Sequence, residues 1–152
     1  MGLFQPVGGN GHGELKNKFN NSMKKFSVKD LEYIPAGHED VNNPGVLKKV
    51  MFTVNDVKIE GTIQMVNWSK MAIGNKFSRH YHEYMDEVFI IISGKAEIEV
   101  GEEKAILEAT DAIYLPQRVE HEMENVGTED LYYIAMGIVT APGGKTVVVD
   151  KK

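Results

Sequence analysis

Short runs of β-branched and aromatic residues, divided by turn residues, recur along most of the chain and constrain its fold more than any other feature. Gly, Asn, Asp or Pro separates the runs about every 8–12 residues, and no run keeps the 3.6-residue apolar period of a helix. We expect strands at residues 46–54, 57–68, 79–84, 87–93, 95–100, 103–108, 111–116, 120–126, 130–140 and 145–150. About ten short strands with almost no helix predict an all-β sandwich or barrel.

The first 44 residues depart from this pattern. Residues 1–22 are rich in Gly, Asn and Lys, and we interpret them as a flexible N-terminal extension, with Met23 as a candidate natural start. Residues 23–44 read as a lead-in segment with an edge strand and a short helical turn, capped by Ser27 and with Asp30 in its first turn. Residues 45–150 are then expected to form one barrel domain, which suits a chain of 152 residues.

The charge and the missing cysteines exclude several classes of function. A formal net charge of −5 argues against a nucleic-acid or anionic-membrane partner, because either would favour a basic face. The chain has no cysteine, so any bound metal must be held by His, Asp or Glu. No run has the length and apolarity of a signal peptide or a membrane span, and we therefore expect a cytoplasmic protein.

Two histidines two positions apart, His80 and His82, are the strongest sign of chemistry in the chain. On a strand such residues face the same side, about 6.6 Å apart along the chain, so both imidazoles can reach one cation. Glu87 follows just past a bend and can return a carboxylate to that space, whereas His121 can join only through folding. An isolated pair arises easily by chance, but the acid and the flanking glycines at fixed offsets argue against an accident.

These residues carry a resemblance to a known family. Residues 74–94 match the first motif of the cupin family, G-x5-H-x-H-x4-E-x6-G, at every position. Residues 110–125 resemble the second cupin motif, G-x5-P-x-G-x2-H-x3-N, and the matching residues are Pro116, His121 and Asn125. Thr110 and Arg118 stand in place of the two motif glycines. A glycine at 118 would suit a turn with positive φ, so Arg118 must adopt that conformation at some cost or reshape the turn.

The resemblance implies a fold, a metal and a mode of association. The fold is a double-stranded β-helix, or jelly-roll barrel, of six to eight antiparallel strands with little helix, as in small single-domain bacterial cupins. The implied metal ligands are His80, His82, Glu87 and His121. Nitrogen and oxygen ligands without sulfur suit a divalent Fe, Mn, Zn, Ni or Co ion equally. A homodimer that pairs through a strand near the N-terminus is also implied.

A metal in such a site allows several functions. We expect a metal-dependent enzyme that acts on a small polar or anionic molecule, as a dioxygenase, a sugar-phosphate isomerase-like enzyme, or a decarboxylase or lyase. The alternatives are a non-catalytic metal or small-ligand binding module, and a purely structural barrel with an empty site. In all three, no nucleic acid and no membrane is expected as a partner.

The residues that would touch a substrate are only weakly indicated. Tyr84 shares the face of the histidines, although core packing explains it as well. Gln64 lies on a neighbouring strand whose parity the break at Gly61 obscures. Arg118 stands near the mouth of the barrel, where it can pair with an anion or simply be solvated. The two remaining histidines, His12 and His38, lie in loop-like segments and are interpreted as bystanders.

Overall fold

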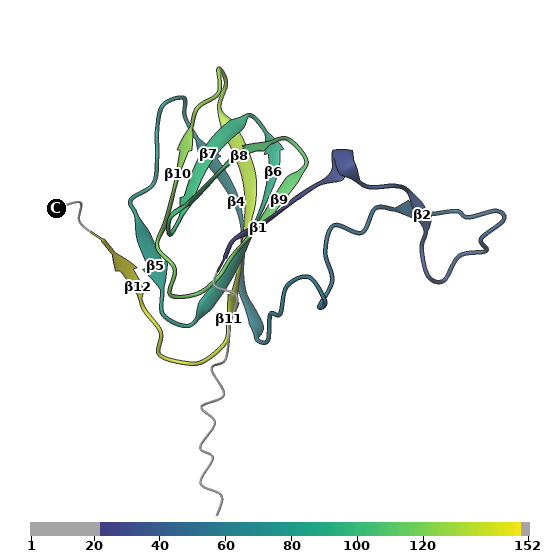
Figure 1. The fold of residues 1–152 in the computed structure, drawn as a ribbon, viewed down its shortest axis with the longest axis horizontal. Coiled ribbons are helices and arrows are strands. Elements are labelled where there is room, and N and C mark those ends of the chain that lie inside the picture. Colours follow the sequence, from purple (N-terminus) through teal and green to yellow (C-terminus); the bar gives the residue numbers. More distant parts are fainter. Residues whose placement is uncertain (1–21, 150–152) are drawn as a thin grey trace, which may run out of the picture.

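The computed structural model describes residues 22–149, which form two facing five-stranded antiparallel sheets (Figure 1). The first sheet has the order β1 (Lys24–Ser27), β9 (Asp111–Leu115), β6 (Met85–Ser93), β11 (Leu131–Val139) and β4 (Thr62–Met71). The second sheet has the order β12 (Thr146–Val148), β5 (His80–His82), β10 (His121–Asn125), β7 (Lys95–Val100) and β8 (Glu103–Glu108). The predicted all-β antiparallel fold with little helix is confirmed.

The lead-in to the barrel contains the predicted helical turn. A single 3-10 turn, η1 (Val28–Asp30), follows β1, and the side chain of its cap Ser27 accepts a hydrogen bond from the backbone nitrogen of Lys29 at 3.4 Å. Strand β1 pairs with β9 and lies at one end of the first sheet. Among residues 22–149, no helix is long and apolar enough to cross a membrane.

Residues 28–61, here called the arm, leave the barrel and project from its side (Figure 1). Apart from η1, the arm contains only the two-residue strands β2 (Ile34–Pro35) and β3 (Leu47–Lys48), which pair with each other. The strand predicted at 46–54 is therefore wrong except at β3. Within the described chain, the other residues of this run pair with no strand. The next predicted strand begins not at residue 57 but at Thr62.

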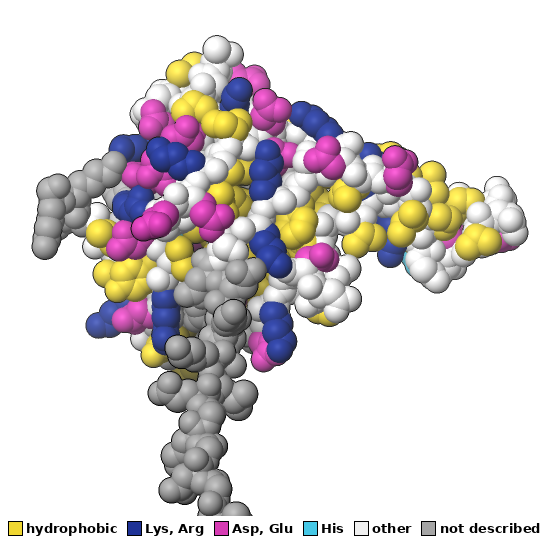
Figure 2. All heavy atoms as spheres, viewed as in Figure 1, with side chains coloured by type: hydrophobic (Ala, Val, Ile, Leu, Met, Phe, Trp, Pro, Cys, Tyr) yellow, Lys and Arg dark blue, Asp and Glu magenta, His cyan; other side chains and the backbone are white. Residues whose placement is uncertain are grey.

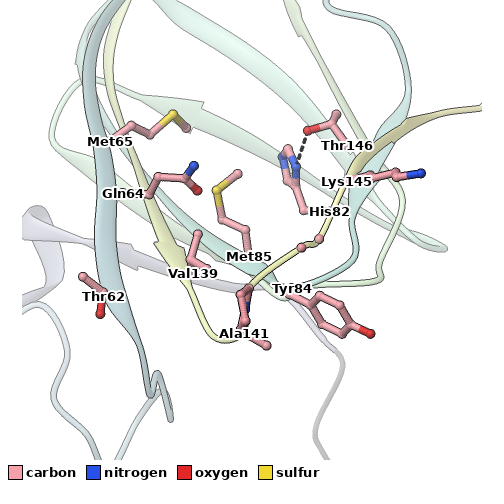
Figure 3. A pocket seen from close by; sticks show the side chains of 13 residues that line it. Thr62, Gln64, Met65, His82, Tyr84, Met85, Val139, Ala141, Lys145 and Thr146 are labelled. Carbon is pink, nitrogen blue, oxygen red and sulfur yellow. Dashed lines mark hydrogen bonds between the residues drawn. The ribbon is translucent and has the colours of Figure 1, made fainter.

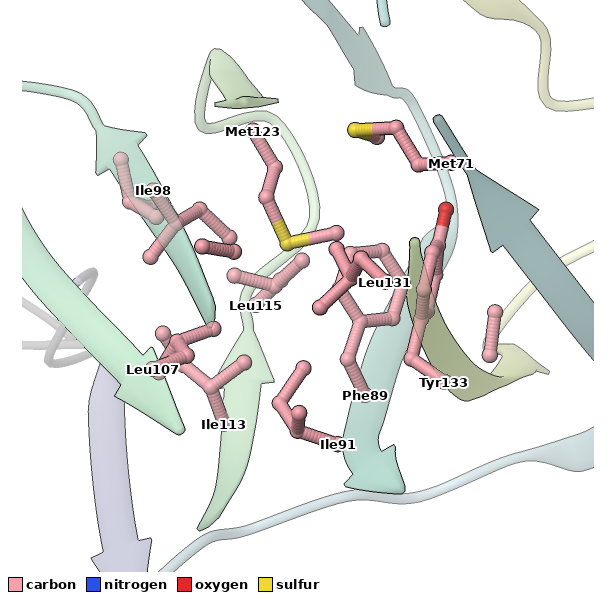
Figure 4. Packing of buried hydrophobic residues seen from close by; sticks show 13 residues of the cluster. Met71, Phe89, Ile91, Ile98, Leu107, Ile113, Leu115, Met123, Leu131 and Tyr133 are labelled. Carbon is pink, nitrogen blue, oxygen red and sulfur yellow. The ribbon is translucent and has the colours of Figure 1, made fainter. Parts of the chain in front are cut away.

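The main hydrophobic core fills the space between the two sheets (Figure 4). Alternate residues of each strand point inward, and the largest fully buried side chains come from both sheets. They include Ile91, Ile98, Leu107, Ile113, Leu115, Met123 and Leu131.

A second, smaller cluster lies on the outer face of the first sheet. There the returning part of the arm places Val57 and Phe52 against Val88, Tyr114 and Ile138. The arm thus covers the outer face at its β6 and β9 side.

Candidate metal centre

The four residues predicted as metal ligands converge inside the barrel. His80 and His82 lie at alternate positions of β5, and His121 on β10 is paired directly with His80 across the strands. Glu87 reaches the same space from β6 in the opposite sheet. One ligand atom from each residue lies within 4.8 Å of all the others. The structure therefore brings together, from three separated segments, a group that is able to hold a metal ion.

Each histidine is oriented through its Nδ1 atom. Nδ1 of His80 lies 2.7 Å from the carbonyl oxygen of Ser78, and Nδ1 of His121 lies 3.0 Å from that of Val119. A carbonyl oxygen only accepts, so these two nitrogens carry the proton and Nε2 is left with a free lone pair. Nδ1 of His82 lies 2.9 Å from the hydroxyl of Thr146, which β12 contributes. Such outer partners fix the tautomer of metal-binding histidines.

The centre contains a buried polar atom that the protein itself does not satisfy. His121 is 1% exposed, and its Nε2 has no hydrogen-bond partner in the described chain although Oε2 of Glu87 lies 3.2 Å away. Leaving such an atom unpaired is costly, and native proteins rarely do so without a ligand or ion. A lone pair aimed at a carboxylate and two further imidazoles fits a divalent transition metal, whose identity the donor set leaves open.

The protonation of the group also suits metal binding. Burial alone would raise the pKa of Glu87, but the neighbouring His121 and His82 outweigh it and lower the pKa to about 2. His82 Nε2 lies 3.1 Å from Oε2 of Glu87. Burial also lowers the pKa of His80. At neutral pH Glu87 is therefore ionised and His80 neutral, which are the forms that bind metal.

Arg118, which departs from the family motif, lies in the turn between β9 and β10. It adopts a φ of 63°, as a glycine would, so this turn keeps its shape at the expense of backbone strain. Its backbone nitrogen donates to the carbonyl of His82 at 2.7 Å, and its Nε donates to the carbonyl of Glu83 at 3.1 Å. The guanidinium lies 5.1 Å from the centre of the Tyr84 ring. Arg118 thus braces the segment that carries His82.

A cavity of about 760 Å³ opens beside the centre, with His82 in its wall (Figure 3). Met65, Met85 and Val139 form an apolar part of the wall, and Gln64 adds an amide that points toward them. The loop at residues 141–146 closes one side of the cavity.

The two methionines of the cavity wall lie against Gly137 on β11. A Cβ at that position would lie 2.7 Å from Sδ of Met85 and 3.1 Å from Met65, so a larger residue would require these flexible side chains to shift. The sequence pattern had not indicated these methionines, and it had not indicated Thr146, because only strand pairing brings them to the site.

The weaker candidates occupy different places. Gln64 and Tyr84 both line the cavity, with the Tyr84 ring turned away from Gln64 (Figure 3). Arg118 is not among the lining residues. His38 is exposed on the arm, where its Nε2 lies 3.2 Å from Glu39, and His12 lies outside the described residues.

Residues 67–137 match the family model described as Cupin domain. This stretch contains all four residues of the centre, and together with the two-sheet fold the match supports a small cupin-domain protein.

Two curated relatives match part of the chain. The chain is 28% identical over 74 residues to polyketide synthase CurC of Streptomyces cyaneus, which covers 49% of this chain and 48% of the relative. It is also 28% identical over 72 residues to the uncharacterized protein MJ1618 of Methanocaldococcus jannaschii, covering 47% and 58%. The matches thus span about half the length of these curated relatives.

Among solved structures, hazelnut (Corylus avellana) vicilin superposes with a TM-score of 0.51 at 13% identity. The superposition covers 57% of this chain and 27% of vicilin. At this identity the likeness concerns the fold alone.

Proposed function

We propose that this protein is a metal-dependent enzyme that acts on a small molecule bound through its oxygen atoms. The observation that carries the proposal is the shared wall: His82 belongs both to the metal-capable group and to the lining of the 760 Å³ cavity. Cavities of roughly 300–1,000 Å³ typically hold small ligands. A ligand in this cavity therefore meets the centre directly.

The chain's own residues have definable tasks in such a reaction. A bound ion of the proposed kind supplies Lewis-acid or redox chemistry. The carbonyls of Ser78 and Val119 and the hydroxyl of Thr146 hold the imidazoles in place. The amide of Gln64 can hydrogen-bond an oxygen atom of the ligand.

The cavity refines the class of substrate. Met65, Met85 and Val139 offer an apolar surface away from His82, and Lys145 is the one cation among the lining residues. Figure 3 shows its side chain pointing away from Gln64 and Met85. We infer a substrate with an oxygen-rich end at the centre and an apolar substituent against the methionines. This favours a dioxygenase, decarboxylase or lyase over an enzyme that acts on sugar phosphates.

A second function is favoured by a different observation. The lining residues of the cavity include no carboxylate and no histidine except His82. Apart from His82, the only residues of the cavity wall that can act as a general acid or base are therefore Tyr84 and Lys145. A non-catalytic module that captures a small ligand through the ion needs neither.

Metal content and turnover test the two proposals in sequence. Elemental analysis of the purified protein should find about one transition-metal ion per chain, and His82→Ala should lose it, whereas His38→Ala, a histidine outside the group, should keep it. Metal-loaded protein is then incubated with small 2-oxo acids, 2-hydroxy acids and catechols. Oxygen consumption indicates a dioxygenase, conversion without oxygen indicates a decarboxylase or lyase, and retention of an unchanged ligand indicates the binding module. Metal content that His82→Ala leaves unchanged would contradict both.

A further inference from the structure

Strand β4 contains an extra residue where it borders the cavity. Met65 lies opposite Gly137 of β11, and the next residue pair along the two strands is Ile63 with Ile138. Gln64 lies between the two pairs and has no counterpart on β11, so it forms a β-bulge.

The bulge brings the side chain of Gln64 to the cavity. Successive side chains of a regular strand point to opposite faces, so neighbours in sequence do not line the same wall. Gln64 and Met65 nevertheless both line this cavity, and Figure 3 shows the Gln64 amide pointing toward Met85. Bulges re-aim side chains in this way and are over-represented next to active sites. The backbone of β4 therefore places the amide in the wall.

The amide is free to bind a ligand. Gln64 is exposed, and within residues 22–149 no other group hydrogen-bonds its side chain. An amide both donates and accepts, so it can pair with a hydroxyl or a carbonyl group. Such a group replaces water at the amide, which limits the gain in affinity to that of an ordinary hydrogen bond.

The wall around the amide is almost free of charge. Figure 2 shows basic and acidic side chains mixed on the outside of the barrel, whereas the lining residues of the cavity include no carboxylate and Lys145 as their one cation. The side chain of Lys145 points away from Gln64 (Figure 3), and the hydroxyl of Thr146 is engaged by His82. A ligand group beside Gln64 is therefore expected to be polar but uncharged, because a carboxylate or phosphate would lack a cation there.

Gln64 and the metal-capable group come to the cavity from opposite sheets. Gln64 belongs to β4 of the first sheet, and His82 belongs to β5 of the second. Packed sheets lie about 10 Å apart, so one small molecule can contact both. Met65, Met85 and Val139 come from the first sheet and offer that molecule an apolar surface.

We propose that Gln64 is a specificity-determining residue, which selects ligands by the polarity of the end that lies away from the metal centre. The preferred ligand binds the ion through oxygen atoms at one end, places an apolar segment against the methionines and ends in a hydroxyl or carbonyl group at Gln64. This inference rests on the proposed function, because the first end needs an ion at the centre. It adds a neutral polar end to the description of the substrate class.

Hydroxamic acids of graded chain length test this selection, because a hydroxamate binds divalent transition metals through its oxygen atoms. Each chain length is prepared with a methyl, a hydroxyl or a carboxylate end, and dissociation constants for the metal-loaded protein are measured by isothermal titration calorimetry. At the best-fitting length, the ratio of the methyl-ended to the hydroxyl-ended constant should be roughly 2- to 10-fold larger for wild type than for Gln64→Leu. The carboxylate-ended probe should bind wild type no more tightly than the methyl-ended probe.

Asn67→Leu is the matched control. Asn67 carries the same amide on the same strand but is not among the lining residues, and its Nδ2 donates to Sδ of Met65 at 3.2 Å. A shift of Met65 affects the apolar segment that the probes share, so the ratio should equal that of wild type. Gln64→Ala, measured in parallel, should give the same loss as Gln64→Leu, so the result does not depend on the fit of leucine. Circular dichroism and metal content verify that the variants keep the fold and the centre.

The outcomes separate this inference from the proposed function. Hydroxamates that bind with the same ratio to wild type and Gln64→Leu at every chain length would overturn the inference and leave the proposed function standing. Tightest binding of the carboxylate-ended probe would assign a charged group to the far end and would also overturn it. Metal-loaded protein that binds no hydroxamate would contradict both, since no ligand would then reach the centre from the cavity.

Discussion

The two sheets of this barrel share one core but differ on their outer faces. On the second sheet, Lys104 pairs with Glu97 and Glu99, and Arg79 pairs with Glu120. On the first sheet, the corresponding surface carries the exposed Ile63, Val66 and Trp68 of β4 and the apolar cluster under the arm. Among the described residues, the second sheet therefore presents charged side chains to water where the first sheet presents apolar ones. The inward-facing residues of a strand determine the fold, and the outward-facing residues determine the character of the surface. Two sheets of one barrel can therefore share a core and still differ in what they present to solvent.

The inner faces are more nearly equivalent. The second sheet supplies three imidazoles and the first supplies the carboxylate of Glu87, so the centre joins the two sheets. Experiments can therefore ask where the two sheets behave alike and where they differ.

The largest effects are expected in the shared core, where the sheets should behave alike. Leu107 of the second sheet and Leu115 of the first are 0% and 1% exposed. Replacing either with alanine removes buried methyl groups and leaves a cavity, which should lower the free energy of unfolding by about 2–5 kcal/mol. Urea unfolding of both variants measures this. A loss below about 1 kcal/mol in only one of them would show that the core is not shared equally.

The next effect concerns the contribution of Glu87 to the stability of the metal-free protein. Its pKa is lowered from the ordinary 4.5 to about 2, so the folded state holds fewer protons and the stabilisation is complete above pH 4.5. It should disappear as the pH falls from 4.5 towards 2, amounting to up to about 3 kcal/mol.

Acid titration of wild type and Glu87→Gln isolates this contribution. The variant should lack the part of the pH dependence between 4.5 and 2. Burial also lowers the pKa of His80, so protonation of His80 at falling pH destabilises the fold in both proteins. Identical pH profiles would show that Glu87 is not held ionised by its neighbours.

A smaller effect is expected at Thr146, which lies on β12 of the second sheet and has no counterpart beside Glu87 on the first. Thr146→Val removes the hydroxyl beside Nδ1 of His82 and keeps the shape of the side chain. Metal affinity should fall by roughly 10–100-fold, as measured by competition with a chromophoric chelator. Thr146→Ser, which keeps the hydroxyl, should restore most of it. Equal affinities in wild type and Thr146→Val would mean that the hydroxyl does not position His82.

The smallest effect is expected on the charged outer face. Lys104 is an exposed partner of Glu97 and Glu99. Lys104→Ala should leave the urea unfolding midpoint nearly unchanged, because surface ion pairs contribute little. A clear fall in the midpoint would show that this ion pair stabilises the fold.

The sequence predicted the elements that depend on local pattern. Strand alternation located most barrel strands, and the spacing of His80, His82 and Glu87 indicated a group that the structure does assemble. The departure at Arg118 was also informative, since the residue adopts the positive φ that a glycine would have taken.

Other features depend on contacts that local pattern does not contain. The run 46–54 has the composition of a strand, but a strand forms only where a partner supplies hydrogen bonds. In the described chain only Leu47 and Lys48 find such a partner. Thr146 reaches His82 only because β12 pairs with β5. Met65 and Met85 meet across Gly137 for the same reason.

The space left by Gly137 has a consequence for ligand choice. Methionine side chains are unbranched and polarizable, so Met65 and Met85 can rearrange around substituents of different outline at small energetic expense. In the metal-capable group, by contrast, each of the three imidazole rings is held by a hydrogen bond at its Nδ1 atom. Discrimination should accordingly be strict for the chelating head of a ligand and lenient for its tail, which makes this scaffold a good starting point for altering what it accepts.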